Sequence, residues 1–143
     1  MSPRFFVALL ALLTLLAGCG HDAPQAALEA AVARLQNTLE AKQTTAVLDQ
    51  LHPQFSAQQQ SLDRDWAKRS MALVFLRYKN IRVLVLSEDS QLDPTYSQKA
   101  HTQARVALTG AEGLIPDSAR QYQVDLEWWL EDGEWKLARL NWQ

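Results

Sequence analysis

The chain has 143 residues, of which 48% are hydrophobic and 21% charged, and this length accommodates one domain rather than two. Its 14 Lys and Arg against 16 Asp and Glu give a net charge of -2, and the basic residues are scattered, so the composition excludes the usual basic type of nucleic-acid-binding protein and shows no footprint for an anionic membrane surface. Five Trp argue against a disordered chain, and a single cysteine excludes an internal disulfide or a multi-cysteine metal site.

The first nineteen residues have the form of a secretory signal. Residues 1–4 carry one positive charge, and residues 5–17 form an apolar run that ends before Gly18-Cys19. A helix needs roughly 20 apolar residues to cross a bilayer, so this run is short for a permanent span. The sequence Leu16-Ala17-Gly18-Cys19 resembles the lipobox of bacterial lipoproteins, in which an aliphatic residue and two small residues precede the cysteine.

The lipobox resemblance implies cleavage between Gly18 and Cys19 and a diacylglyceryl group on the Cys19 thiol. Residues 1–18 are then the signal peptide, residues 19–23 a lipidated tether, and residues 24–143 a single domain. Two or three acyl chains hold a protein stably on a membrane. Gly20, in the position that sorts such proteins, implies the periplasmic face of the outer membrane of a Gram-negative bacterium. The alternative is an ordinary secretory signal or an uncleaved anchor, in which Cys19 is incidental.

Helical patterns dominate the first half of the domain. A helix is expected to begin at Pro24, with an apolar stripe that recurs at helical spacing, namely Leu28, Val32, Leu35 and Leu39. A second short helix, starting at Thr44 or Thr45, is expected to end at His52-Pro53, and residues 56–60 are predicted to be a loop. A third helix is predicted from residue 61 or 63. Its last turns, up to Tyr78, are apolar nearly all round and are predicted to be buried.

Strand patterns follow. Residues 81–86 are short and aliphatic, and residues 100–109 and 122–130 alternate apolar and polar side chains. Asp132-Gly133 predicts a two-residue type I′ hairpin, followed by a strand over 134–142. The turn places Trp128 opposite Leu137 and Leu126 opposite Arg139. Trp128, Leu130, Trp135 and Leu137 then face the helices, whereas Trp129, Lys136, Leu140 and Trp142 share the other face. Trp129 and Lys136 are a candidate cation–π pair.

Helices followed by strands without intervening helices predict an α+β domain, with N-terminal helices packed on an antiparallel sheet of about four strands. The segments LDQLHPQF (48–55), YKNIRVLVLSED (78–89) and WWLEDGEWKLARLNW (128–142) carry a resemblance to the nuclear transport factor 2-like superfamily, which includes ketosteroid isomerases and polyketide cyclases. The resemblance implies a cone-shaped, cystatin-like fold with a pocket at its wide end and dimers formed through the outside of the sheet. The alternative is another small α+β fold.

Two groups of candidate site residues follow from this register. The candidate pocket is lined by Tyr122, Trp128, Trp135, Arg139 and Asn141, in which Arg139 would orient an anionic or polar ligand among aromatic walls. The alternative is that Arg139 lies at the sheet edge or pairs with a helix carboxylate, or that a bulge turns it outward. The candidate interface is Trp129, Leu140 and Trp142, for a homodimer or an envelope partner.

The sequence shows no catalytic constellation. Enzymes of this superfamily need a carboxylate or His as base and a Tyr or protonated acid as oxyanion donor. The candidates are Tyr96, His101, Tyr122 and Asp125, but Tyr122 and Asp125 have opposite parity on one strand, and His101 is predicted to face solvent. No metal site or cofactor is expected. We expect a non-catalytic envelope lipoprotein that binds a small apolar ligand or a protein. The alternatives are an interaction or dimerisation module and an isomerase or dehydratase.

Overall fold

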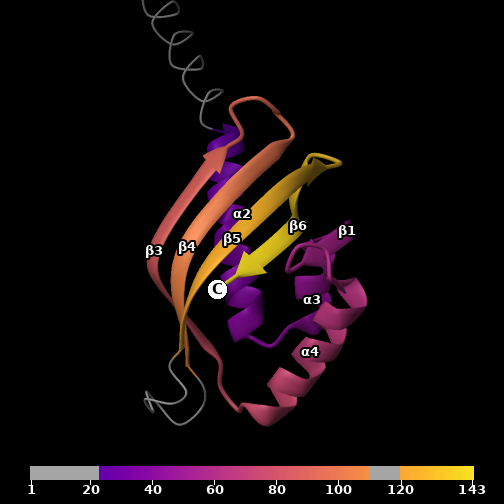
Figure 1. Cartoon of the computed structure of the whole chain (residues 1–143), viewed down its shortest axis with the longest axis vertical. Helices are drawn as coiled ribbons and strands as arrows, with labels where there is room; N and C mark the ends of the chain where they lie inside the picture. The colour runs from indigo at the N-terminus through magenta and orange to yellow at the C-terminus, as the bar shows by residue number, and fades with distance from the viewer. Residues whose placement is uncertain (1–22, 110–119) are drawn as a thin grey trace, which may run out of the picture.

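A computed structural model of the chain describes residues 23–109 and 120–143 (Figure 1). The predicted signal peptide, the cleavage site at Gly18, the lipidated Cys19 and the tether up to residue 22 lie outside the described residues. The elements, in chain order, are α2 (Ala23–Glu40), α3 (Thr44–Asp49), β1 (Leu51–Ala57), β2 (Leu62–Asp63), α4 (Arg64–Arg77), β3 (Arg82–Leu92), β4 (Lys99–Thr109), β5 (Arg120–Glu131) and β6 (Glu134–Trp142). Among these residues, no helix is both long and apolar enough to cross a membrane.

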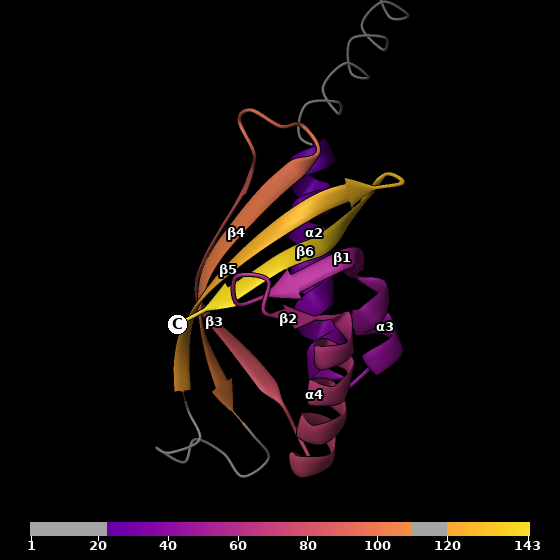
Figure 2. The same cartoon turned by 45° about the vertical axis from the view of Figure 1, so that its right-hand side comes forward.

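The strands form one curved sheet in the order β2-β1-β6-β5-β4-β3, with α2 packed along one face (Figures 1 and 2). Only β1 and β6 run parallel, and every other neighbouring pair is antiparallel. The predicted α+β class is confirmed. The sheet has six strands rather than about four, because β1 comes from residues expected to be the end of a helix and a loop, and β2 comes from residues expected at the start of the third helix.

The predicted end of the second helix at His52-Pro53 is wrong, because these two residues belong to β1. Helix α3 ends at Asp49, and β1 begins two residues later at Leu51. Leu51 pairs with Leu137 and Ser56 with Arg139, with an irregularity between the two pairs that contains Pro53. Proline has no backbone N–H to give to a sheet, so it is tolerated where the regular pairing is interrupted.

Helix α4 begins as predicted and ends differently. The Asp63 carboxylate caps its first turn by accepting a hydrogen bond from the Trp66 N–H at 2.9 Å. Its buried side chains are Ala67 and Met71. The last turns were predicted to be buried, but Leu73 is 70% exposed and Leu76 87% exposed. The helix packs on α3, β1 and β2, and its C-terminal half continues beyond them (Figure 2).

The core lies between α2 and the inner face of the sheet. Trp128 and Leu28 are fully buried there, and Trp135 and Leu137 are nearly so, which confirms the predicted inner face of the hairpin. The indole N–H of Trp128 donates to the Thr102 hydroxyl at 3.1 Å, so its one polar atom is satisfied in the core.

The hairpin itself starts as predicted and then departs from the expected register. Asp132 and Gly133 have φ values of 49° and 80°, as a type I′ turn needs, and Trp128 pairs with Leu137. Glu127, however, pairs with Arg139, so Ala138 is an extra residue that forms a β-bulge. The predicted pairing of Leu126 with Arg139 is therefore wrong.

The bulge reverses the facing of the last four residues of β6. Leu140, which pairs with Leu126, and Trp142 pack against the core, and the Trp142 ring stacks on Trp66 at a centroid distance of 5.7 Å. Arg139 and Asn141 consequently lie on the outer face, away from α2, which is the bulge alternative stated for Arg139 above.

Candidate functional site

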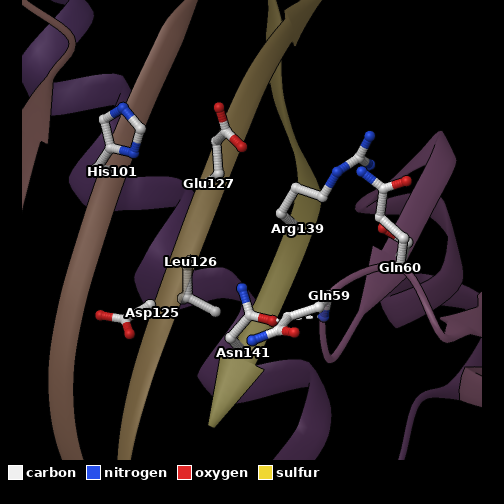
Figure 3. A pocket seen from close by; sticks show the side chains of 9 residues that line it. Gln59, Gln60, His101, Asp125, Leu126, Glu127, Arg139 and Asn141 are labelled. Carbon is white, nitrogen blue, oxygen red and sulfur yellow. Dashed lines mark hydrogen bonds between the residues drawn. The ribbon is translucent and has the colours of Figure 1, made fainter.

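A polar groove lies on the outer face of the sheet, with α2 behind the strands in the view of Figure 3. Its volume is about 380 Å³, within the range of roughly 300–1,000 Å³ typical of small-ligand pockets. We call it the outer-sheet groove. The residues that line it come from β1, the β1–β2 loop, β4, β5 and β6, and they are Ser56, Gln59, Gln60, His101, Asp125, Leu126, Glu127, Arg139 and Asn141.

Strand pairing brings the charged groups of the groove together. His101 pairs with Glu127, and Glu127 pairs with Arg139 on its other side, so one row of side chains crosses three strands. Asp125 pairs with Asn141 in the neighbouring row. Directly paired residues point to the same face of a sheet. The bulge at Ala138 is what places Arg139 and Asn141 in these rows.

The Arg139 side chain is held in place from one edge. Its Nη1 donates to the backbone carbonyls of Gln54 and Ala138, each at 2.8 Å, and the guanidinium carbon lies 4.7 Å from the ring centroid of Trp129. A guanidinium has five N–H donors. Nε and Nη2 make no hydrogen bond with the described residues. The edge that suits a carboxylate is therefore left available for a ligand.

Trp129 stands under this guanidinium and is fixed by several neighbours. The His52 ring meets it edge-on at 4.8 Å between centroids, and the Lys99 ammonium lies 5.5 Å from its centroid. The predicted cation–π pair with Lys136 is wrong, because Lys136 donates to the Asp49 carbonyl at 2.6 Å and pairs with Glu134 instead. Trp129 is thus a rigid support for Arg139.

The loop after β1 has an unusual backbone. Gln58, Gln59 and Gln60 have φ values of 49°, 57° and 72°, in the left-handed region that residues other than glycine rarely adopt. The Gln58 side chain holds the loop on β6: its amide accepts from the Trp142 N–H at 3.0 Å and donates to the Trp142 carbonyl at 3.2 Å. Backbone strain of this kind gathers at functional sites.

His101, which lines one end of the groove, pairs with Asp93. His101 Nε2 lies 2.8 Å from Asp93 Oδ2, while Asp93 Oδ1 accepts from the N–H groups of Thr95 and Tyr96, each at 2.8 Å. The backbone N–H of Tyr96, the His101 side chain and the N–H of Thr95 together lower the pKa of Asp93 to about 2. Asp93 is thus an anion at neutral pH. The His101 side chain is 48% exposed, which agrees with its predicted outward facing.

The structure divides both predicted groups of site residues between the two faces. Of the candidate pocket, Trp128 and Trp135 belong to the core and Tyr122 lies on their face, whereas Arg139 and Asn141 lie outside. Of the candidate interface, Trp129 faces outward, and Leu140 and Trp142 pack inward. The physical reason in each case is the bulge at Ala138, which changes the parity of the strand after Leu137.

Two features of the site were not predicted from the sequence. The glutamine run at 58–60 was read as a loop, and its contacts with β6 have no local sequence signal. Asp93 was not among the predicted site residues, although the tendency of an Asp side chain to accept a hydrogen bond from the backbone N–H two residues further on was available as a signal. Within residues 23–109 and 120–143, no three His, Asp or Glu side chains are grouped so as to hold a metal ion.

No family model matches the sequence, and no curated protein matches it. Solved structures do match. Bdellovibrio bacteriovorus Bd1075 has a TM-score of 0.72 at 10% identity, over 89% of this chain and 44% of that one, so the chain spans less than half of Bd1075. An NTF2-like protein of unknown function from Pseudomonas putida KT2440 has a TM-score of 0.71 at 7% identity, over 85% and 86% of the two chains.

A putative ketosteroid isomerase from Shewanella frigidimarina has a TM-score of 0.64 at 16% identity, over 82% of this chain and 94% of that one. At such identities the likeness shows the fold alone. The chain has the nuclear transport factor 2-like fold, in which helices pack on a curved sheet and which is shared by proteins described as isomerases and dehydratases.

Proposed function

We propose that this chain is a lipid-anchored, non-catalytic binding module of the bacterial cell envelope, and that the outer-sheet groove binds a small zwitterion carrying a carboxylate and an amine. The expected ligand was apolar. The groove argues for a polar one, because eight of the nine residues that line it have polar or charged side chains. Its ligand must therefore replace the hydrogen bonds that these groups make with water.

The observation that carries the proposal is the free edge of Arg139. Because Nη1 is held by two carbonyls and the guanidinium lies over Trp129, the Nε–Nη2 edge is already oriented before a ligand arrives. Two parallel N–H donors suit a carboxylate, and little side-chain freedom remains to be lost on binding.

The amine would meet the carboxylates across the groove. Glu127 lies between Arg139 and His101, and its partner among the described residues, the Lys99 ammonium, is 3.7 Å away. Asp125 makes no ion pair within the described part of the chain. A ligand with both a carboxylate and an amine is attracted by Arg139 at one end and by these carboxylates at the other. An acid alone is repelled by the carboxylates, and an amine alone is repelled by Arg139.

Titration calorimetry on the full chain in detergent micelles tests this function. The probes are alanyl-alanine, propionate and ethylamine, at one ionic strength. We expect alanyl-alanine to bind at least about tenfold more tightly than either single-charge probe. Arg139→Gln and Asp125→Asn should each weaken its binding about tenfold or more, and Arg139→Lys should restore little because it lacks the fork. Arg105→Gln, an exposed arginine on β4 outside the groove, is the matched control. Equal binding of the dipeptide by wild type and Arg139→Gln would refute the proposed site.

The lipid anchor is tested separately by growing cells with a palmitate analogue that can be labelled. We expect wild type to incorporate the label and Cys19→Ala to lack it. Label on the Cys19→Ala form, or none on the wild type, would refute the anchor and leave the groove proposal standing. The fraction in which the labelled protein is recovered distinguishes outer from inner membrane.

A second candidate function is catalytic, and the His101–Asp93 pair favours it. A charged carboxylate that holds one nitrogen of a histidine leaves the other nitrogen available as a general base. The 48% exposure of His101 argues against it, since little water is excluded from the ring. Proton exchange at the carbon beside the carboxyl of a bound ligand, lost in His101→Gln, would decide for catalysis.

A further inference from the structure

The exposed face of α4 combines leucines with arginines. Arg69, Leu73, Leu76 and Arg77 follow one another at spacings of four, three and one, so they lie on one side of the helix. All four are exposed, and Leu76 is the most exposed large apolar side chain of the described residues, at 87%. A soluble helix normally presents polar side chains on this face.

The apolar surface continues to the end of the helix, and hydrogen bonds stabilise the last helical turn. Val74 and Tyr78 are also exposed, at 41% and 37%. The Lys42 ammonium donates to the carbonyls of Phe75 and Tyr78, which satisfies carbonyl groups of the last turn. The final turns of α4 are therefore held helical by Lys42 while Leu73 and Leu76 stay largely exposed.

The stretch of sequence that contains this surface carries charges of one sign only. Residues 66–87 contain five Lys and Arg and no Asp or Glu, in a chain whose net charge is -2. These basic residues are Lys68, Arg69, Arg77, Lys79 and Arg82. The basic residues are scattered along the chain as a whole, but this stretch is an exception that was not singled out from the sequence. An occupant of the surface must be both apolar and anionic, and a second copy of the same surface would be repelled.

We propose that this surface, defined by Arg69, Leu73, Leu76, Arg77 and Lys79, docks on an anionic phospholipid bilayer. A single protruding helix face with leucines between cations fits an interface where apolar side chains enter the acyl region and Arg and Lys reach the headgroups. The surface lies at the opposite end of the molecule from the start of α2 (Figures 1 and 2). A chain held at its N-terminus can thus present it to a second membrane.

Vesicle bridging tests the docking. The full chain is placed on neutral phosphatidylcholine vesicles, and fluorescent vesicles containing about a quarter phosphatidylglycerol are added. We expect recruitment of the anionic vesicles, at least about tenfold weaker recruitment of neutral ones, and a steep loss as NaCl rises from about 0.05 to about 0.5 M. If the chain leaves the neutral vesicles, its own co-sedimentation with the anionic ones gives the same comparison, and only the anchor proposal fails.

Paired variants separate the apolar and the charged contributions. Leu73→Ser with Leu76→Ser, and Arg77→Glu with Lys79→Glu, should each lower recruitment about tenfold or more. The matched control, Arg34→Glu with Arg105→Glu, makes the same charge change at exposed positions on α2 and β4 and should stay within about twofold of wild type. Because the altered residues are exposed, circular dichroism should show unchanged helix content.

Three outcomes would overturn the proposal. The first is equal recruitment of neutral and anionic vesicles. The second is wild-type recruitment by the Leu73→Ser, Leu76→Ser variant. The third is no recruitment by wild type while an acidic, leucine-rich peptide binds the same face, which would assign the surface to a protein partner. The outer-sheet groove plays no part in these measurements, so they stand or fall independently of the proposed ligand.

Discussion

Thr102 satisfies the only polar side-chain atom of Trp128, the largest fully buried side chain among the described residues. Its hydroxyl accepts from the Trp128 indole N–H at 3.1 Å and lies 2.8 Å from the Ser90 hydroxyl. In Thr102→Val the shape is kept, but the buried indole N–H is left without an acceptor, so we predict a loss of about 1–3 kcal/mol in the free energy of unfolding. Urea unfolding measures it. A change of only a few tenths of a kcal/mol would mean that another acceptor replaces Thr102.

Asp93 gives the protein a pH dependence with a known sign. Its pKa in the folded state is about 2, below the ordinary value of 3.8, so its carboxylate stabilises the fold above about pH 4, and this contribution is lost as the pH falls toward 2. We predict that His101→Gln raises the pKa of Asp93, but not fully to 3.8, because the N–H groups of Tyr96 and Thr95 remain. Carboxyl carbon NMR titration measures both values. An unchanged midpoint in His101→Gln would contradict the assigned cause.

The bulge shows how far the sequence determines an element. The alternation of β5 and the Asp132-Gly133 turn predicted both strands and the pairs as far as Trp128 with Leu137. Nothing local marks Ala138 as the extra residue, because its selection depends on burying Leu140 and Trp142 against α4 and the core. The position of the bulge also determines that Arg139 and Asn141 lie on the outer face of the sheet. The groove could therefore not be predicted from the hairpin alone.

The glutamine loop permits a matched pair of predictions. Gln60 has a φ of 72° and makes no hydrogen bond with the described residues, so Gln60→Gly relieves strain and should raise stability by about 1 kcal/mol. Gln58→Gly relieves a similar strain but removes both side-chain bonds to Trp142, and it should lower stability. Thermal unfolding compares them. Equal shifts of the same sign in the two variants would show that the Gln58 amide does not hold the loop on β6.

At the scale of the whole molecule, prediction failed where distant elements decide burial. The apolar composition of residues 71–78 predicted a buried helix end, yet α4 runs past the elements it packs on, so Leu73 and Leu76 stay exposed. Likewise, β1 lacks a clear alternation, and its place beside β6 comes from tertiary pairing. The helix-then-strand order was sufficient for the α+β class, since it leaves few other ways to cover a sheet.

The groove, the start of α2 and the α4 surface occupy different parts of the molecule. The groove lies on the outer face of the sheet, α2 begins at one end of the long axis, and α4 ends toward the other (Figure 1). The proposed ligand and the proposed bilayer contact therefore do not compete for space. Loss of either by mutation should leave the other intact.

The most direct test of the central claim is an NMR titration of the full chain in micelles with alanyl-alanine, observing arginine Nε–H and tryptophan indole N–H signals. We predict that the signals of Arg139 and Trp129 move saturably with the calorimetric affinity, while those of Arg105 and Trp128 stay in place. Saturable binding that leaves the Arg139 and Trp129 signals unmoved, or no binding at all, would contradict the assignment of the outer-sheet groove as the ligand site.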